Sequence, residues 1–280
     1  MERALGWRPT RFRRAAAGRG ESDTAARWIV ANDGASAFVK IGATELTAEW
    51  TRTEHRNYRS LEGWFLPRVL GFDDDGERPA LALEDLSEAI WPPPWTDRQV
   101  GAVLDALAAV RQTTPPEHLL GISVDDFGTS WRDVGRNPTS FLKLGLCSGS
   151  WLEANLPTLI AAVDAAPLAG DALVHLDIRS DNLCFRGGRA VLIDWNHACI
   201  ANADLDIAGW LPSLHAEGGP PPELILPSAP ELAAWIAGYF CSHAGEAPVP
   251  GAPHVRPLQL QQARTALPWA VRALGLPALP

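Results

Sequence analysis

Hydrophobic and polar residues alternate over the first third of the chain in short runs that are typical of β-strands. Turn residues separate these runs at 18–20 and at 32–34, where an Asn-Asp-Gly sequence favours a hairpin. A helix is expected to begin at Thr44 or Thr47 and to end near residue 61, because its apolar positions then repeat with helical spacing. The strands predicted by the pattern are 7–14, 25–31, 35–41, 67–72 and 79–84.

The composition changes at residues 91–95, which read Trp-Pro-Pro-Pro-Trp and directly follow the last of these strands. Beyond them, apolar residues recur mainly at helical spacing. The predicted helices are 96–112, 150–165, 204–214, 230–241 and 256–274. A strand-loop-strand island at 173–193 interrupts the helical part. The pattern therefore predicts a bilobal α+β fold, with a sheet-rich N-lobe at 1–90 and a mainly helical C-lobe at 91–280.

Composition narrows the class of protein. The 280 residues are 46% hydrophobic and 20% charged, which argues against a largely disordered or fibrous chain. The 24 basic and 33 acidic residues give a formal net charge of −9. This charge disfavours non-specific binding to nucleic acid and is compatible with a cationic small-molecule partner.

The cysteines and the apolar runs bear on location. The four cysteines form no Cys-x-x-Cys pair, so they are expected to be reduced thiols rather than zinc ligands or disulfides. No apolar run approaches the length of a membrane span, and the first residues lack the apolar core of a secretory signal. The arginines among the first 19 residues could belong to a transit peptide, but a basic opening strand is the favoured interpretation. A cytoplasmic protein without a membrane partner is expected.

The island carries the residues with the clearest chemistry. Two apolar strands present Asp177, Asn182 and Asp194 from their connecting loops. Oxygen ligands of this kind suit Mg²⁺, which takes one or two carboxylates together with phosphate oxygens and water. The sequence thus predicts a site for a metal and a nucleotide.

These residues also carry a resemblance to a known family. The motif H-x-D-x-R-x-x-N at 175–182 and the Ile-Asp-Trp triplet at 193–195 resemble the catalytic loop and the metal-binding Asp of the aminoglycoside phosphotransferase-like kinases, which are relatives of the protein kinases. Lys40 looks like the lysine of the third strand, and 81–86 looks like the hinge between the lobes. The resemblance extends over most of the chain and implies an ATP-dependent kinase that acts on a small-molecule hydroxyl.

The resemblance implies roles for individual residues. Asp177 would accept or orient the proton of the attacking hydroxyl, and Arg179 would stabilise the migrating phosphoryl group. Asn182 and Asp194 would hold Mg²⁺ on the β- and γ-phosphates of ATP. Asp206 would brace the catalytic loop through its backbone.

Further roles concern the nucleotide. Lys40 would bind the α- and β-phosphates and pair with Glu54, although Glu45 and Glu49 lie on the same predicted helix and could take the place of Glu54. His175 is expected to be a hydrogen-bonded scaffold residue. The remaining candidates are the residues of a short phosphate loop and of the hinge that meets adenine, namely Gly18, Gly20, Ser22, Glu84 and Leu86.

The acceptor is less clear. An aminoglycoside is the nominal acceptor by resemblance, and the family also includes kinases of other small molecules. A run at 210–220 could form a lid. Three rivals stay open: a catalytically silent nucleotide-binding scaffold, a protein kinase, and a two-metal phosphohydrolase. The oligomeric state is also open. Polar and aromatic candidates for the acceptor wall are Asp181, His197, Asp204, His215, Glu217, Trp195, Trp210 and Trp235.

Overall fold

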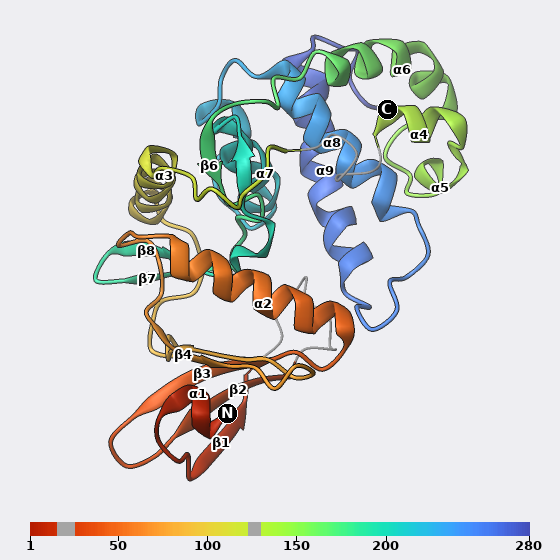
Figure 1. The fold of residues 1–280 in the computed structure, drawn as a ribbon. Coiled ribbons are helices and arrows are strands. Elements are labelled where there is room, and N and C mark those ends of the chain that lie inside the picture. Colours follow the sequence, from red (N-terminus) through yellow and green to blue (C-terminus); the bar gives the residue numbers. More distant parts are fainter. Residues whose placement is uncertain (16–25, 123–129) are drawn as a thin grey trace.

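The N-terminal part is a five-stranded antiparallel sheet in the order β1-β2-β3-β5-β4 (Figure 1). The structure is a computed structural model and describes residues 1–15, 26–122 and 130–280. A helix lies against each face of this sheet, α1 (Glu2–Leu5) on one and α2 (Glu45–Ser60) on the other. The strands are β1 (Arg11–Arg14), β2 (Ala26–Ala31), β3 (Ser36–Ile41), β4 (Val69–Asp73) and β5 (Ala80–Glu84).

Side-chain alternation along β3 explains how this sheet presents Lys40. Ala37 and Val39 pack in a small apolar cluster with α1, whereas Phe38 lies with the main core on the face towards α2. Because side chains on a strand alternate between its two faces, Lys40 shares the face of Phe38. Lys40 therefore points between the sheet and the rest of the molecule.

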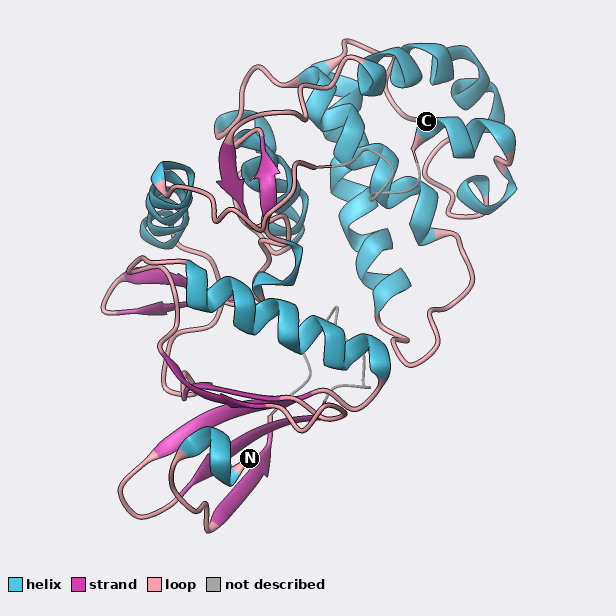
Figure 2. Cartoon of the chain, in the orientation of Figure 1, coloured by secondary structure: helices cyan, strands magenta, loops and turns pink. Residues whose placement is uncertain are grey.

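Helix α2 separates the sheet from the helical part in Figure 2. Thr44 caps the helix in a reciprocal capping box with Thr47, which satisfies amide groups that the first turn leaves unpaired. Glu54 and Tyr58 lie on its buried face, together with Thr47 and Thr51. This spacing of three to four residues is the helical repeat, so one face of α2 is committed to the interior.

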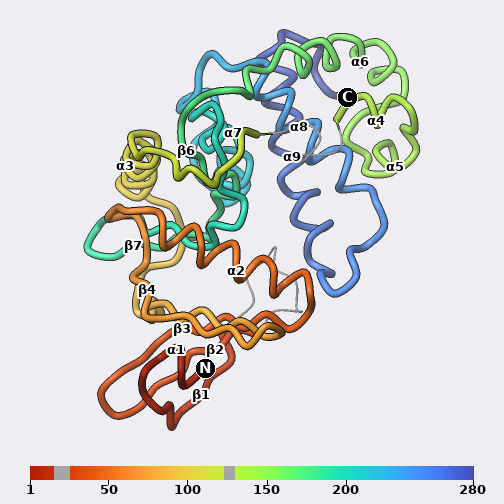
Figure 3. The backbone as a smooth tube through the Cα atoms, in the orientation of Figure 1, coloured from red at the N-terminus to blue at the C-terminus, as the bar shows by residue number. Residues whose placement is uncertain are grey.

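The C-terminal part is mainly helical, with α8 and α9 packed side by side and α7 against α9 (Figure 1). Figure 3 shows the two chain ends in different parts of the molecule, the N-terminus at the sheet and the C-terminus among the helices. The α-helices are α3 (Asp97–Gln112), α4 (Trp131–Arg136), α5 (Thr139–Leu142), α6 (Gly149–Asp164), α7 (Asp204–Ala216), α8 (Pro230–Ala244) and α9 (Val255–Ala273).

Two short antiparallel ribbons carry the island loop. The first pairs β6 (Ala172–Val174) with β9 (Cys199–Ala201), and the second pairs β7 (Leu183–Arg186) with β8 (Arg189–Leu192). Residues 175–182 run from β6 to β7. Ile90 and Phe185 exchange backbone hydrogen bonds of 3.0 and 2.8 Å, so the segment between the two parts is attached to this second ribbon.

The prediction of a strand over 7–14 is wrong at its start. The chain opens with α1, which ends at Gly6 in the left-handed conformation at φ 72°, and β1 covers Arg11–Arg14 alone. A four-residue helix is too short to show a period, so the pattern missed it, as it missed α4 and α5. The predicted turn at 18–20 lies outside the described residues. Within the described part of the chain, no helix is both long and apolar enough to cross a membrane.

Candidate active site

Lys40 and Glu54 form a buried ion pair between β3 and α2. The Lys40 ammonium donates to Glu54 Oε2 at 2.8 Å, and their side chains are 6% and 2% exposed. Glu45 and Glu49 are exposed on the same helix, so the buried face of α2 selects Glu54. Burial lowers the pKa of Lys40, but the nearby carboxylates of Asp194 and Glu54 outweigh it and raise that pKa well above its usual value.

Asp194 joins this pair from the end of β8. Its Oδ1 accepts from the Lys40 ammonium at 2.9 Å and also from the side-chain amide of Asn196. Its backbone is left-handed at φ 65°, and its N–H donates to the hydroxyl of Tyr58 on α2 at 3.2 Å. Burial raises the pKa of Asp194, yet the positive charge of Lys40 prevails and holds it below its usual value. Asp194 is thus an ionised carboxylate at neutral pH.

Asp177 lies in a second charged group on the loop between β6 and β7. Its Oδ1 accepts from Arg179 at 2.6 Å, and its Oδ2 accepts from the side-chain amide of Asn182 at 2.7 Å. Arg179 also donates to Asp181 at 3.0 Å. Burial opposes the charge on Arg179, but the two aspartates overcome it and raise the pKa of the guanidinium. One guanidinium thus bridges two carboxylates of the same loop, Asp177 and Asp181.

Asp206, in the first turn of α7, braces the start of this loop. Its carboxylate accepts from the backbone N–H of His175 at 2.9 and 3.0 Å and from that of Leu176 at 2.7 Å. Leu176 has a left-handed φ of 61°, a conformation that disfavours side chains with a Cβ and needs such support. Burial raises the pKa of Asp206 to about 6, against the two backbone donors. The brace inferred for Asp206 from the sequence is present.

His175 is a scaffold residue, as expected. Its ring is fully buried, with Nε2 2.9 Å from the carbonyl of Ile193 and Nδ1 accepting from the N–H of Asp177 at 3.2 Å. Burial lowers its pKa, which favours the neutral ring that these two bonds require. Both ring nitrogens are used inside the protein, so His175 offers none to a metal, contrary to the two-metal hydrolase hypothesis.

Glu217 braces the other end of the loop, a role that sequence reasoning missed. Its carboxylate accepts from the hydroxyl of Ser180 at 2.6 Å and from the indole of Trp95 at 2.9 Å. Trp95 belongs to the segment that connects the two parts of the molecule. These partners lie 37 and 122 residues from Glu217 in the sequence, and no local pattern marks such contacts.

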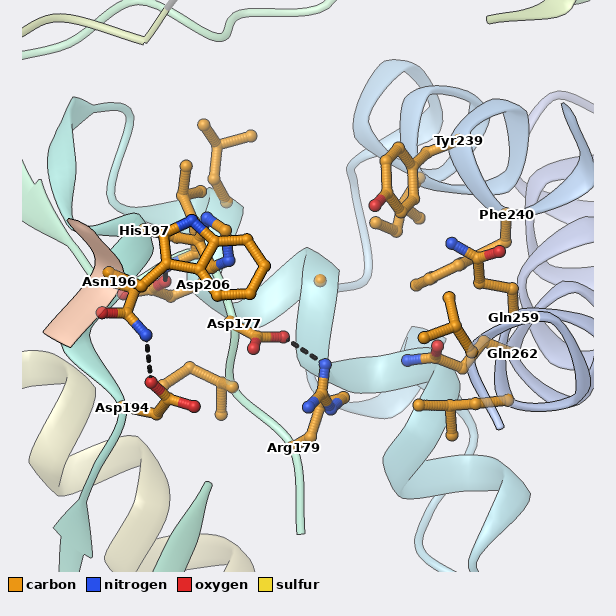
Figure 4. A pocket seen from close by; sticks show the side chains of 18 of the residues that line it. Asp177, Arg179, Asp194, Asn196, His197, Asp206, Tyr239, Phe240, Gln259 and Gln262 are labelled. Carbon is orange, nitrogen blue, oxygen red and sulfur yellow. Dashed lines mark hydrogen bonds and ion pairs between the residues drawn. The ribbon is translucent and has the colours of Figure 1, made fainter. Parts of the chain in front are cut away.

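Two cavities meet at Lys40 and Asp194. The first, here the sheet-side cavity, has a volume of about 460 Å³ and lies between β2, β3, the hinge and the loop residues Ser180 and Asp181. The second, here the helix-side cavity, has a volume of about 360 Å³ and lies between the catalytic loop and α7, α8 and α9 (Figure 4). Asp177 and Arg179 line the helix-side cavity.

The hinge residues line the sheet-side cavity but use their polar groups internally. The carboxylate of Glu84 accepts from the backbone of Arg68 at 2.9 Å and pairs with Arg186. The carbonyl of Leu86 accepts from the indole of Trp91 at 3.1 Å. Gly18, Gly20 and Ser22 of the predicted phosphate loop lie outside the described residues.

The candidates for the acceptor wall fall in different places. His197 and Trp235 line the helix-side cavity, and Asp181 lines the sheet-side cavity. Asp204, His215 and Glu217 are absent from the described lining of both cavities. Trp195 and Trp210 are fully buried core residues, so neither can form part of the acceptor wall.

The side-chain oxygens of Asn182 and Asp194 are suitable ligands for a hard divalent cation. Asp194 is an ionised carboxylate, and the amide nitrogen of Asn182 is engaged by Asp177, which leaves its oxygen as the metal-binding group. Together they provide two protein oxygens, the number that Mg²⁺ takes when phosphates and water complete its coordination.

A lysine-bearing sheet that faces an Asp- and Asn-bearing loop across a cleft defines the kinase-like phosphotransferases as a class. The chain belongs to the phosphotransferase enzyme family (APH), whose family model matches residues 15–249. This is a family of ATP-dependent kinases of small-molecule hydroxyls. No curated protein matches the chain.

Solved structures share the fold at low sequence identity. A thermostable mutant of aminoglycoside phosphotransferase APH(4)-Ia, in ternary complex with AMP-PNP and hygromycin B, superposes with a TM-score of 0.60 at 14% identity and covers 96% of each chain. Choline kinase LicA from Streptococcus pneumoniae superposes with a TM-score of 0.58 at 13% identity and covers 91% of this chain and 93% of its own. Spectinomycin phosphotransferase APH(9)-Ia, in complex with ADP and spectinomycin, superposes with a TM-score of 0.54 at 13% identity and covers 98% of this chain and 84% of its own.

Proposed function

We infer that this protein transfers the γ-phosphoryl group of MgATP to a hydroxyl of a small molecule. The observation that carries the proposal is the junction of the two cavities, where Lys40 bonds to both Glu54 and Asp194 and where Asp177 lies on the opposite loop. A triphosphate in the sheet-side cavity and a hydroxyl in the helix-side cavity would meet at this junction. We assign nucleotide binding to residues 1–90 and acceptor binding, with the catalytic loop, to residues 91–280.

Each residue of the junction has a defined task. Lys40, fixed by Glu54, binds the α- and β-phosphates, and the hinge at Glu84 and Leu86, which lines the sheet-side cavity, meets the base. Asn182 and Asp194 would hold Mg²⁺, which would supply positive charge to the phosphates of ATP. The same ion would compete with the Lys40 ammonium for Asp194.

The acceptor hydroxyl is oriented by Asp177. As its oxygen forms a bond to the γ-phosphorus, the bond to the ADP oxygen breaks and the hydroxyl proton passes to the Asp177 carboxylate. Arg179, which bonds to Asp177, follows the phosphoryl group with its guanidinium. Related structures hold hygromycin B or spectinomycin, so an aminoglycoside-like compound is one candidate acceptor, alongside other small hydroxyl compounds.

The test is acceptor-dependent release of ADP. Asp177→Asn keeps the size of the side chain but removes the base, and we expect kcat to fall by about 10²–10⁴-fold while MgATP still binds. Asp204→Asn is the matched control, because it changes an aspartate of α7 that lines neither cavity among the described residues. Full acceptor-dependent turnover in Asp177→Asn would contradict the assignment. Nucleotide binding without turnover of any acceptor would favour the silent scaffold.

A further inference from the structure

The walls of the helix-side cavity differ sharply in charge. On the side of the catalytic loop, the described lining contains three carboxylates, Asp177, Asp194 and Asp206. Each already has partners: Asp177 bonds to Arg179, Asp194 to Lys40, and Asp206 to backbone N–H groups. An ammonium group of an acceptor would have to share these carboxylates with the partners that they already have among the described residues.

The opposite wall is uncharged and comes from α8 and α9. Figure 4 shows Tyr239, Phe240, Gln259 and Gln262 across the open space from Asp177. Trp235 adds a third aromatic ring to the same lining. Aromatic rings of this size bind flat apolar faces, and amide side chains bind hydroxyls through both a donor and an acceptor.

Gln262 is the most informative residue of this wall. It is 3% exposed, and within the described chain its side-chain amide has no hydrogen-bond partner. In Figure 4 the amide points from α9 towards Arg179. Among the described residues, the polar side-chain atoms that are buried without a partner are Asn196 Oδ1 and Trp210 Nε1, so the Gln262 amide faces the open space of the cavity. There it can bind a ligand group that both donates and accepts a hydrogen bond.

Gln259 makes the same wall unfavourable for a cation. Its Oε1 accepts from the Arg256 guanidinium at 2.8 Å, and its side chain also bonds to Tyr239. Its acceptor oxygen is thus engaged by a positive group, as is the Asp177 carboxylate by Arg179. An ammonium group donates hydrogen bonds only, so it would leave the Gln262 amide nitrogen without a partner.

We propose that the acceptor of this enzyme is an uncharged polyhydroxy compound with an aromatic or other flat apolar group, rather than a polycation. The inference rests on the proposed function and adds the chemistry of the substrate to it. One hydroxyl lies at Asp177, a second hydroxyl bonds to the Gln262 amide, and the flat group packs on the rings of α8. The amide selects against a quaternary ammonium, which neither donates nor accepts a hydrogen bond, although aromatic rings alone would tolerate one.

The experiment compares acceptors that share a scaffold and differ in one charge. Phenyl β-D-glucoside and phenyl 2-amino-2-deoxy-β-D-glucoside form such a pair, and hygromycin B, spectinomycin and choline complete the panel. Binding to the MgADP-loaded protein and MgATP-dependent phosphorylation are both measured. We expect the uncharged glycoside to bind and to react with a kcat/KM at least tenfold above that of its amino analogue, the factor that one lost hydrogen bond gives.

Variants of Gln262 then test the wall itself. Gln262→Glu supplies a carboxylate, and we expect it to reverse the preference within the pair by about tenfold or more. Gln262→Leu removes the hydrogen bond without adding charge, so it should weaken the uncharged glycoside and give nothing to the amine. Gln261→Glu is the matched control: it adds the same charge at the preceding residue of α9, outside the described lining, and should leave the preference unchanged.

Two outcomes overturn the inference. One is binding or turnover confined to the amines or choline, and the other is the absence of any binding by uncharged compounds. The proposed function has a separate readout, because MgATP binding that Asp194→Ala abolishes would still support it in either case. Loss of MgATP binding in the unmodified protein would instead contradict the proposed function.

Discussion

The sheet-side and helix-side cavities share Lys40 and Asp194, but they are built in different ways. The sheet-side cavity is formed mostly by neighbouring strands and by the hinge that continues β5. The helix-side cavity combines the catalytic loop with three helices, whose lining residues are spread from Leu205 to Gln262. The first thus depends mainly on one sheet and its hinge, and the second depends on how distant helices pack.

The two cavities therefore differ in how their residues are specified, the first by short sequence motifs and the second by the packing of helices. The groups that we propose to handle phosphate lie on a strand, a helix and one loop, each marked by a short motif, although Lys40 and Asp194 lie 154 residues apart in the sequence. The groups that we propose to select the acceptor lie on α8 and α9, where tertiary packing decides which face of each helix is buried. A change in the second set can alter the acceptor without disturbing the first, as expected when function depends on sites carried by a common fold.

The largest effect on stability is expected at Lys40, the residue common to both cavities. Lys40→Met leaves Glu54 and Asp194 buried without their cation, so the free energy of unfolding should fall by about 3–5 kcal/mol in urea titration. Adding Glu54→Gln to this variant removes one of the two charges and should restore part of the loss.

An exposed ion pair provides the control for Lys40. Arg136 pairs with Asp133 at 2.7 Å on the surface of α4, and Arg136→Met should cost at most about 0.5 kcal/mol. If Lys40→Met lowered the free energy of unfolding by as little, the junction of the two cavities would not depend on this ammonium. Lys40 would then not be the residue that links the two cavities.

The residues that we propose to handle phosphate could be selected from the sequence because their motifs are short. Lys40 was selected by its resemblance to the third-strand lysine of the family, and the loop motif brings Asp177, Asn182 and Asp194 within 18 residues of one another. Glu54 rather than Glu49 faces Lys40 because it lies on the buried face of α2 with Thr47, Thr51 and Tyr58. Which face of α2 is buried depends on its packing against the sheet, so the sequence left this choice open.

The acceptor side was not predictable in the same way. The sequence placed Glu217 among residues that would meet the acceptor, but its carboxylate holds Ser180 and Trp95. Gln262 showed no signal, because a glutamine on a helix is usually a surface residue. Both outcomes depend on which faces of α7 and α9 the core covers, and no single helix determines that.

The second prediction concerns Asp206, which lines the helix-side cavity and accepts a hydrogen bond from the backbone N–H of Leu176. The pKa of Asp206 is about 6 in the folded protein against an ordinary 3.8. Between about pH 4 and 6 the unfolded chain has lost this proton while the folded one retains it, so stability falls as pH rises through this window. The loss is up to about 3 kcal/mol.

Asp206→Asn tests this linkage, because asparagine keeps an acceptor for the backbone and does not titrate. Urea unfolding at several pH values should show a smaller fall between pH 4 and 6 in the variant. Glu54 also has a raised pKa, owing to burial, but it contributes equally to both proteins. Asp194 acts in the opposite sense and below pH 4, because its pKa is lowered. Identical pH profiles would refute the role of Asp206.

The smallest effect is expected at Glu217, which braces the loop next to the sheet-side cavity. Glu217→Gln keeps one acceptor oxygen for two donors, Ser180 and Trp95, so about 1–1.5 kcal/mol of stabilisation is lost. Ser180 lines the sheet-side cavity, so KM for ATP should rise by up to about tenfold while KM for the acceptor is unchanged. Glu231→Gln, in the first turn of α8, is the matched control. Asp206 at the start of α7 would then support the helix-side cavity, and Glu217 at its end the sheet-side cavity. A change confined to the KM for the acceptor would contradict this division.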